Sequence, residues 1–305
     1  MRSPNERGLY WGASYSLNEG FGSFNRANFW VNGNYNRIIE PDAFTGWWFN
    51  GGFWMQSSGF WEFNLWTNYS PARYDYFEPR VEGRFVENPS VGNVGVWVGS
   101  DNRKKLRVSG SAFVYKLAEE GRNGYEFSLN PRYRFSNQLS LWVRSSYEIQ
   151  NKDTGFVDLG DNDEIYFGQR RRTTVINLIG AQYNFTEKIG LNLRLRHYWA
   201  KAVYSSFHEL SDEGLLLDTD YSADRDFTLN SMNLDVNFNW RFAPGSDIFL
   251  NWKSSVIGYN DDVNTDINTV TYRSGVSEIS GLPQDNSISV RIVYFLDYLS
   301  LQNKF

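Results

Sequence analysis

The amino-acid sequence predicts an all-β protein, a transmembrane antiparallel up-and-down β-barrel of about 12 to 14 strands. Three observations predict this fold. Apolar and polar residues alternate over long stretches, the connections between these stretches are alternately short and long, and no stretch approaches the ~18 consecutive apolar residues of a membrane-spanning helix. Since only helices and closed barrels satisfy every backbone group in lipid, a membrane protein without such helices must be a barrel.

The alternation is clearest between Met232 and Tyr259. Every second residue at its start is apolar (Met232, Leu234, Val236, Phe238 and Trp240), and the residues between them are asparagine or aspartate. Successive side chains of a strand point to opposite faces, so the two faces of this strand meet different surroundings. Strands of soluble proteins usually have ~5 to 6 residues, whereas ~9 to 11 tilted residues cross a bilayer. The length therefore favours one face in lipid and one face toward a polar lumen.

The same alternation, interrupted by turn-forming residues, predicts about thirteen strands along the chain. They span residues 8–18, 26–36, 46–56, 60–69, 93–99, 106–117, 124–135, 139–150, 172–185, 191–204, 227–242, 247–259 and 287–298. The stretch from Arg172 to Gly180 fits neither phase, which indicates a β-bulge near Gly180.

The connections differ in length between the two ends of the strands. Residues 136–138, 186–188 and 243–246 form short turns, whereas the segments 151–165, 205–226 and 260–286 are long and acidic. Bacterial outer-membrane barrels have short periplasmic turns and long extracellular loops. Aromatic residues lie near both sets of connections, as expected at two membrane interfaces. The predicted location is the bacterial outer membrane.

Composition narrows the alternatives further. The chain has 305 residues, a formal net charge of −5 and a mean hydropathy of −0.52, with 12 Trp, 19 Tyr and 23 Phe but no Cys. A disulfide framework and a cysteine metal site are therefore excluded. We expect residues 1–305 to form a single barrel domain.

The N-terminal residues MRSPNERGLYWG lack the regions of a secretory signal. We therefore expect the chain to be a mature form or the C-terminal portion of a larger barrel. With about thirteen strands and a periplasmic C-terminus, Met1 falls on the extracellular side, so at least one strand is expected before it. The first and last strands should then not pair with each other.

Three segments resemble a known family. They are SDNRKKLRVSGS at 100–111, FWEFNLWTNY at 60–69 and SISVRIVYFLDYLSL at 287–301. Together they resemble the C-terminal β-barrel of Bacteroidota outer-membrane proteins of unknown function, which carry an N-terminal periplasmic domain similar to a sugar-binding module. The resemblance implies a barrel and no catalytic residue. The aromatic end of the last strand, up to Tyr298, also resembles the signal that the barrel-insertion machinery recognises.

The alternation assigns residues to the two faces. The residues expected to line the lumen are Arg107, Glu126, Arg132, Arg134, Arg144, Glu148, Arg194, Arg196, Asp235, Arg241, Lys253 and Arg291. Those expected to face lipid are Leu234, Val236, Phe238, Trp240, Leu250, Trp252, Val290, Ile292 and Tyr294. The basic excess of the first set has two interpretations. It is either a positive field that attracts anionic or carbohydrate-related solutes, or a lattice of ion pairs that holds the barrel interior.

The leading functional prediction is a channel or transport-associated barrel, and two alternatives stay open. A membrane anchor or surface receptor would conduct nothing, and a hydrolase would use His208 with the neighbouring carboxylates Glu209, Asp212 and Glu213. Carboxylates of the long loops could also bind Ca²⁺, but they lack the spacing of a known loop motif. We therefore expect no enzyme activity, cofactor, metal site or nucleic-acid partner. The expected partners are outer-membrane lipid, the insertion machinery and a periplasmic domain.

Overall fold

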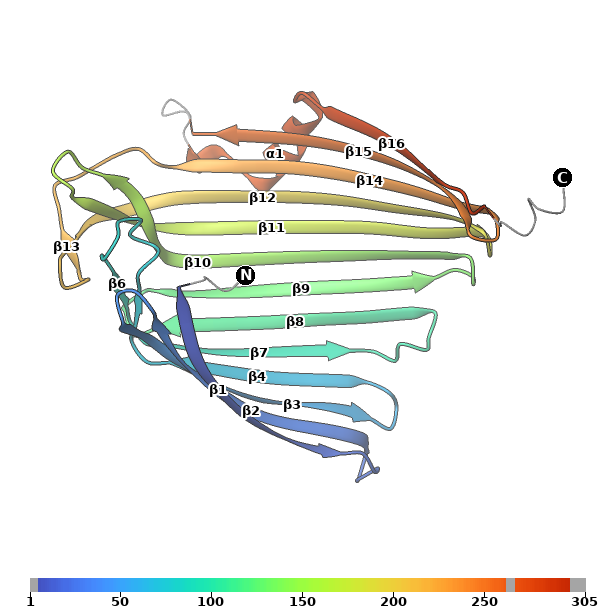
Figure 1. Ribbon diagram of the computed structural model, residues 1–305, viewed down its shortest axis with the longest axis horizontal. Coiled ribbons are helices and arrows are strands. Elements are labelled where there is room, and N and C mark those ends of the chain that lie inside the picture. The colour runs from blue at the N-terminus through green and yellow to red at the C-terminus, as the bar shows by residue number, and fades with distance from the viewer. Residues whose placement is uncertain (1–4, 262–266, 297–305) are drawn as a thin grey trace.

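The computed structural model describes residues 5–261 and 267–296, which form one large antiparallel sheet of fourteen strands and a separate two-stranded sheet (Figure 1). The large sheet contains β1 (Glu6–Leu17), β2 (Phe24–Ile38), β3 (Ala43–Ser57), β4 (Glu62–Ser70), β7 (Val91–Gly99), β8 (Leu106–Leu117), β9 (Asn123–Arg134), β10 (Leu139–Leu159), β11 (Ile165–Thr186), β12 (Ile189–Leu210), β13 (Leu216–Asp218), β14 (Phe227–Ala243), β15 (Ser246–Asn260) and β16 (Asp285–Val293). The small sheet contains β5 (Arg73–Asp75) and β6 (Val86–Asn88). The helical elements are η1 (Ile267–Thr269), α1 (Tyr272–Glu278) and η2 (Ile279–Gly281).

The strands of the large sheet follow one another in chain order, and only β13, which pairs with β12, lies off this path. All thirteen predicted strands are present, and the up-and-down antiparallel order is confirmed. The predicted transmembrane barrel is not confirmed, because the sheet is open: β1 pairs only with β2 and β16 only with β15. Thirteen alternating strands leave the two edge strands running in the same direction, so an antiparallel ladder cannot join them. The expected opening between the first and last strands is therefore present (Figure 1).

Two of the predicted long loops are partly strand. β10 continues to Leu159 and β11 begins at Ile165, so only residues 160–164 connect them. β12 likewise continues to Leu210. The acidic composition of residues 151–165 predicted a loop. These residues extend the hairpin instead, because apolar residues among them pair across it, as Phe156 does with Phe167. The last strand ends at Val293, and the predicted terminal residue Tyr298 lies outside the described residues.

The predicted β-bulge near Gly180 is wrong. Gly180 pairs regularly with Trp142 on β10 and Arg194 on β12. The alternation of apolar and polar residues is broken here for another reason. Asn177 is a polar residue on the apolar face, where its Nδ2 donates a hydrogen bond to the Tyr272 hydroxyl at 2.8 Å. The register shifts of β11 occur elsewhere, opposite Gln150/Asp153 and Phe156/Asp158 of β10, and at Gln169/Arg170 and Asn184/Thr186 opposite β12.

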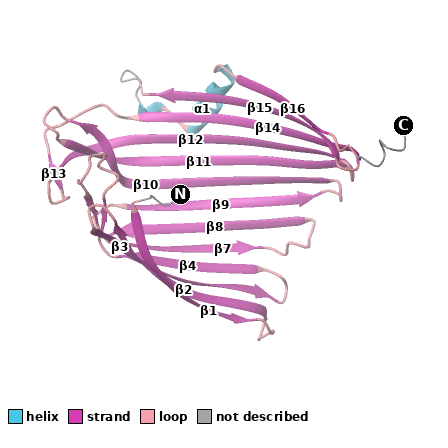
Figure 2. Ribbon diagram, viewed as in Figure 1, coloured by secondary structure: helices cyan, strands magenta, loops and turns pink. Residues whose placement is uncertain are grey.

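The buried core is small and lies at the end where β10, β11 and β12 extend. Val86 of β6 packs there with Ile165, Phe167 and Leu210, and all four are almost fully buried. The segment between β4 and β7, which includes the β5–β6 hairpin, thus covers one face of the sheet at this end. Away from this end and from the helical segment, the sheet is a single layer with both faces accessible (Figure 2).

The helical segment covers the opposite face beside β12 and β14. Gly275 of α1 lies against the indole of Trp199, which is buried, and the Nδ2 of Asn230 donates to the Gly275 carbonyl at 2.6 Å. His197 is also buried, bonded to Asn230 at 2.8 Å and close to Tyr272 of α1. His197 is therefore covered by α1. Among the described residues, no helix has the length and hydropathy needed to cross a membrane.

Candidate functional site

The pairing register places all twelve residues predicted to line a lumen on one face of the large sheet, which we call the polar face. Directly opposite residues of an antiparallel ladder point to the same side. One such row crosses eight strands through Arg107, Arg132, Trp142, Gly180, Arg194, Asp235, Lys253 and Ser287. The other predicted residues occupy equivalent positions on the same strands: Glu126, Arg134, Arg144, Glu148, Arg196, Arg241 and Arg291. That this face lines a lumen stays a prediction.

The opposite face, the apolar face, carries the residues predicted to face lipid. They are Leu234, Val236, Phe238, Trp240, Leu250, Trp252, Val290 and Ile292, while Tyr294 follows the end of β16. Their side chains are accessible, with Val290 63% and Ile292 64% exposed. Large hydrophobic residues are exposed on this face along most of the sheet, including Val96 on β7 and Leu129 on β9. Such an extended apolar surface is typical of a region that contacts lipid or another protein.

The arginines of the polar face are partly neutralised. The ion pairs join Arg194 to Asp235 at 2.9 Å, Arg241 to Asp247 at 3.1 Å and Arg107 to Glu62 at 3.4 Å. Two further guanidinium groups lie over aromatic rings, that of Arg291 over Phe249 and that of Arg196 over Tyr198. Some arginines of the polar face therefore belong to a lattice of ion pairs, and others are exposed and could attract an anionic solute.

Tryptophan is the feature of this face that sequence reasoning missed. Six of the twelve tryptophans share the polar face: Trp30, Trp48, Trp54, Trp66, Trp97 and Trp142. Three of them occupy the space above a glycine of the neighbouring strand, Trp30 above Gly52, Trp66 above Gly95 and Trp142 above Gly180. A Cβ added to any of these glycines would lie 2.7 Å or less from an atom of the indole. The indoles therefore lie across the adjacent strand, half-buried, with ring surface left accessible.

Asparagines form a row beside these tryptophans. Asn32, Asn50, Asn68 and Asn93 are consecutive partners across β2, β3, β4 and β7. Asn50 donates to Asn32 at 2.8 Å, and Asn68 donates to Asn93 at 2.7 Å. Amide groups both donate and accept hydrogen bonds, and indole rings offer flat apolar surface. Together they suit a solute that carries hydroxyl groups on a ring.

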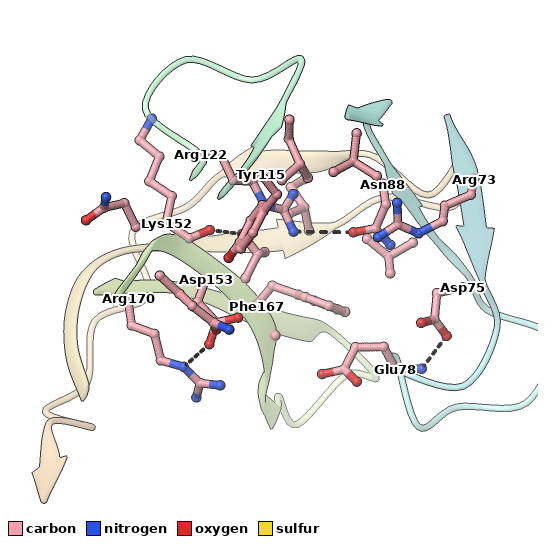
Figure 3. Close-up of a pocket in the computed structure, with 18 of the residues that line it drawn as sticks. Arg73, Asp75, Glu78, Asn88, Tyr115, Arg122, Lys152, Asp153, Phe167 and Arg170 are labelled. Carbon is pink, nitrogen blue, oxygen red and sulfur yellow. Dashed lines mark hydrogen bonds and ion pairs between the residues drawn. The ribbon is translucent and has the colours of Figure 1, made fainter. Parts of the chain in front are cut away.

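A pocket on the polar face lies beneath the β5–β6 hairpin, with a volume of about 490 Å³ (Figure 3). Small-molecule sites commonly have ~300 to 1,000 Å³. The pocket is lined by five basic residues, Arg73, Arg122, Lys152, Arg170 and Arg172, and by four acidic ones, Asp75, Glu78, Glu87 and Asp153. Trp48 and Tyr115 supply its aromatic wall. None of these pocket residues was predicted from the sequence as a site, because they come from separate segments between residues 48 and 172.

A β-bulge shapes one wall of this pocket. The pairing of β10 with β11 shifts between Gln150 and Asp153, and Lys152 has a φ of 50°. A left-handed backbone is unusual for lysine and costs ~1 kcal/mol or more. The bulge brings the carboxylate of Asp153 to the Nε of Arg170 at 2.9 Å. Bulges occur often beside functional sites, where they redirect a side chain.

The candidate hydrolytic residue lies elsewhere. His208 is part of β12 rather than of a loop, and its Nε2 is 3.1 Å from the hydroxyl of Ser206. Its Nδ1 is 3.8 Å from Asp218 of β13, whereas Glu209, Asp212 and Glu213 form no contact with it that would activate water. Among the described residues, no cluster of three or more histidines and carboxylates could hold a metal ion.

Comparison with known proteins identifies a family for the chain. No curated protein matches the chain. A protein-family model described as a domain of unknown function, DUF5916, matches residues 1–305. Because the match spans the whole chain, this protein belongs to the DUF5916 family.

Proposed function

We propose that this chain forms the wall of an outer-membrane β-barrel whose polar face borders a water-filled lumen for hydroxyl-rich or anionic solutes. The observation that carries the proposal is the separation of the two faces across the whole ladder. From β1 to β16 one face presents exposed apolar side chains, and the other presents arginine, asparagine and half-buried tryptophan. A soluble sheet would cover its apolar face with a second layer, and the described residues cover it only at α1.

The direction of the edge strands supports a larger barrel. β1 and β16 run in the same direction and both have unpaired backbone groups. An antiparallel barrel that contains them needs an odd number of additional strands between their free edges. In lipid such edges cost several kcal/mol for each unpaired group, so the proposal requires these strands to be supplied.

Conductance across a planar lipid bilayer tests the proposal. Arg144 and Arg196 are exposed on the polar face and flank Leu178 in one row. We expect a weakly anion-selective conductance, which Arg144→Glu with Arg196→Glu reduces or reverses. Arg171→Glu reverses one charge on the opposite face, half of the change in the double variant, and should leave selectivity unchanged. A cation-selective wild type, or equal effects of the polar-face and control variants, would contradict the proposed lumen.

A non-conducting anchor or receptor is the second candidate. The β5–β6 hairpin favours it, because this hairpin lies over the polar face and narrows the space beside it. Absence of conductance in a protein that is fully inserted into the bilayer would select this alternative.

A further inference from the structure

The pocket beneath the β5–β6 hairpin contains a guanidinium group that lacks a partner. The Nη1 of Arg73 is buried and has no hydrogen-bond partner among the described residues. Its guanidinium carbon lies 5.1 Å from the ring centre of Trp48. A buried donor without a partner costs free energy, and the cost is larger when the group is charged. A ligand that supplies an acceptor at this position would remove that cost.

The neighbouring carboxylates are already engaged. The Oδ1 of Asp75 accepts from the backbone N–H groups of Phe77 at 2.8 Å and of Glu78 at 3.0 Å. The carboxylate of Glu78 accepts from the backbone N–H of Phe156 at 3.0 Å. The missing acceptor for Arg73 is therefore best supplied from outside the protein.

The electrostatics of the pocket favour an anion. Arg122 donates to Asn88 at 3.3 Å and pairs with Glu119 at 3.1 Å (Figure 3). Burial and the nearby positive charge of Arg122 lower the pKa of Arg73 from its ordinary value. An anion between the two guanidinium groups would relieve both effects.

The net charge and the aromatic wall narrow the ligand class. Five basic and four acidic residues line the pocket, so basic residues exceed acidic ones by one. A carboxylate carries one negative charge, whereas a phosphate monoester carries about 1.5 to 2 at neutral pH. Trp48 and Tyr115 provide ring surface, and Asn93 and Asn151 provide amide groups for hydroxyls. A small apolar acid would leave these amides unused, and an inorganic anion would leave most of the volume empty.

We propose that this pocket binds an acidic sugar, a hexuronate unit whose carboxylate pairs with Arg73 and whose ring lies against Trp48. This proposal names the class of solute for the proposed barrel. It rests on the proposed function in one respect, which is that solutes must be able to reach the polar face. Binding and conductance are separate measurements, so each proposal fails independently. Bound hexuronate without conductance would refute the channel alone, and conductance without hexuronate binding would refute the pocket alone.

The test is a titration of the full chain in detergent micelles, followed by calorimetry and by tryptophan fluorescence. Sodium glucuronate is the probe, with glucose and inorganic phosphate as comparisons. We expect glucuronate to bind at least 10-fold more tightly than either comparison. Charge-assisted hydrogen bonds to a carboxylate have a strength that corresponds to about 10-fold or more in affinity. Equal binding of glucose, or tighter binding of phosphate, would overturn the assignment without any variant.

Variants then locate the site. Arg73→Gln should weaken glucuronate binding by at least 10-fold, and Arg73→Lys should weaken it less because the charge stays while the planar fork is lost. Arg171→Gln is the matched control, since Arg171 lies between two pocket arginines in sequence but does not line the pocket. Unchanged affinity in Arg73→Gln, or an equal loss in the control, would show that glucuronate binds elsewhere.

Discussion

Arginine substitutions on the two faces of β14 give the sharpest test of membrane insertion. Val236 is the central residue of the apolar series from Met232 to Trp240, and it pairs with Leu193 and Trp252 on either side. Asn237 is the next residue and points to the polar face between Asn192 and Asn251. Val236→Arg and Asn237→Arg therefore place the same charge at the same depth on opposite faces.

The expected cost follows from the position along the strand. Four residues separate Val236 from each end of the apolar series, which at ~3.4 Å per residue and a tilt of ~40° places it about 10 Å below each interface. This distance exceeds what an arginine side chain bridges without drawing water or headgroups inward. Arginine at the bilayer midplane of a barrel costs ~2 to 4 kcal/mol. The equilibrium constant for folding into vesicles should fall by about 30-fold or more for Val236→Arg.

Folding of each variant into lipid vesicles is followed by tryptophan fluorescence over a urea titration. Asn237→Arg should change the free energy of unfolding by less than ~1 kcal/mol, because its side chain stays in water. If both variants folded with equal free energy, or if the Val236→Arg effect were the same in the absence of lipid, the apolar face would not contact the bilayer.

Three further predictions concern local structure. Gly180→Ala should cost ~1 to 3 kcal/mol, because the new Cβ would lie 2.1 Å from the indole of Trp142, and the cost should disappear in a Trp142→Ala background. The Arg103 guanidinium and backbone N–H hold the pKa of Asp101 at about 2, below its ordinary 3.8. The stabilisation from this carboxylate is therefore present above pH 3.8 and lost as the pH falls through about 2, and Asp101→Asn should remove it in urea titrations across that range. Tyr272→Phe should speed amide exchange in α1 by about 5- to 10-fold, because two polar groups beneath the helix lose their partner.

Matched measurements separate these effects from general loss of stability. Gly92→Ala meets no atom within 4 Å and should be nearly neutral, so an equal cost at both glycines would contradict the steric argument. A stability difference between wild type and Asp101→Asn that persists unchanged down to pH 2 would contradict the role of Arg103. Exchange in β8, which is far from α1 in the sheet, should be unchanged by Tyr272→Phe.

The strands and their two faces can be predicted from the amino-acid sequence alone. Alternation is a local property of an extended chain, so the phase of Leu234 and Asp235 follows from their neighbours alone. The strand assigned to residues 106–117 has the boundaries that β8 has in the structure. Local alternation failed where tertiary contacts changed the surroundings, as at Asn177, whose polar group on the apolar face is satisfied by a tyrosine almost a hundred residues away.

The architecture that the strands form, and the contacts between distant residues, depend on long-range pairing and packing. Closure would require β1 to pair with β16. The number of strands between them leaves these two strands running in the same direction, so they cannot form an antiparallel ladder. Register sets each tryptophan above a glycine of the next strand, and no single-strand pattern contains that relation. The pocket joins Arg73, Trp48 and Arg172 from three distant segments, because the β5–β6 hairpin packs over the polar face. Long-range packing of this kind is selected by the whole fold, so the candidate site became visible only once the sheet was assembled.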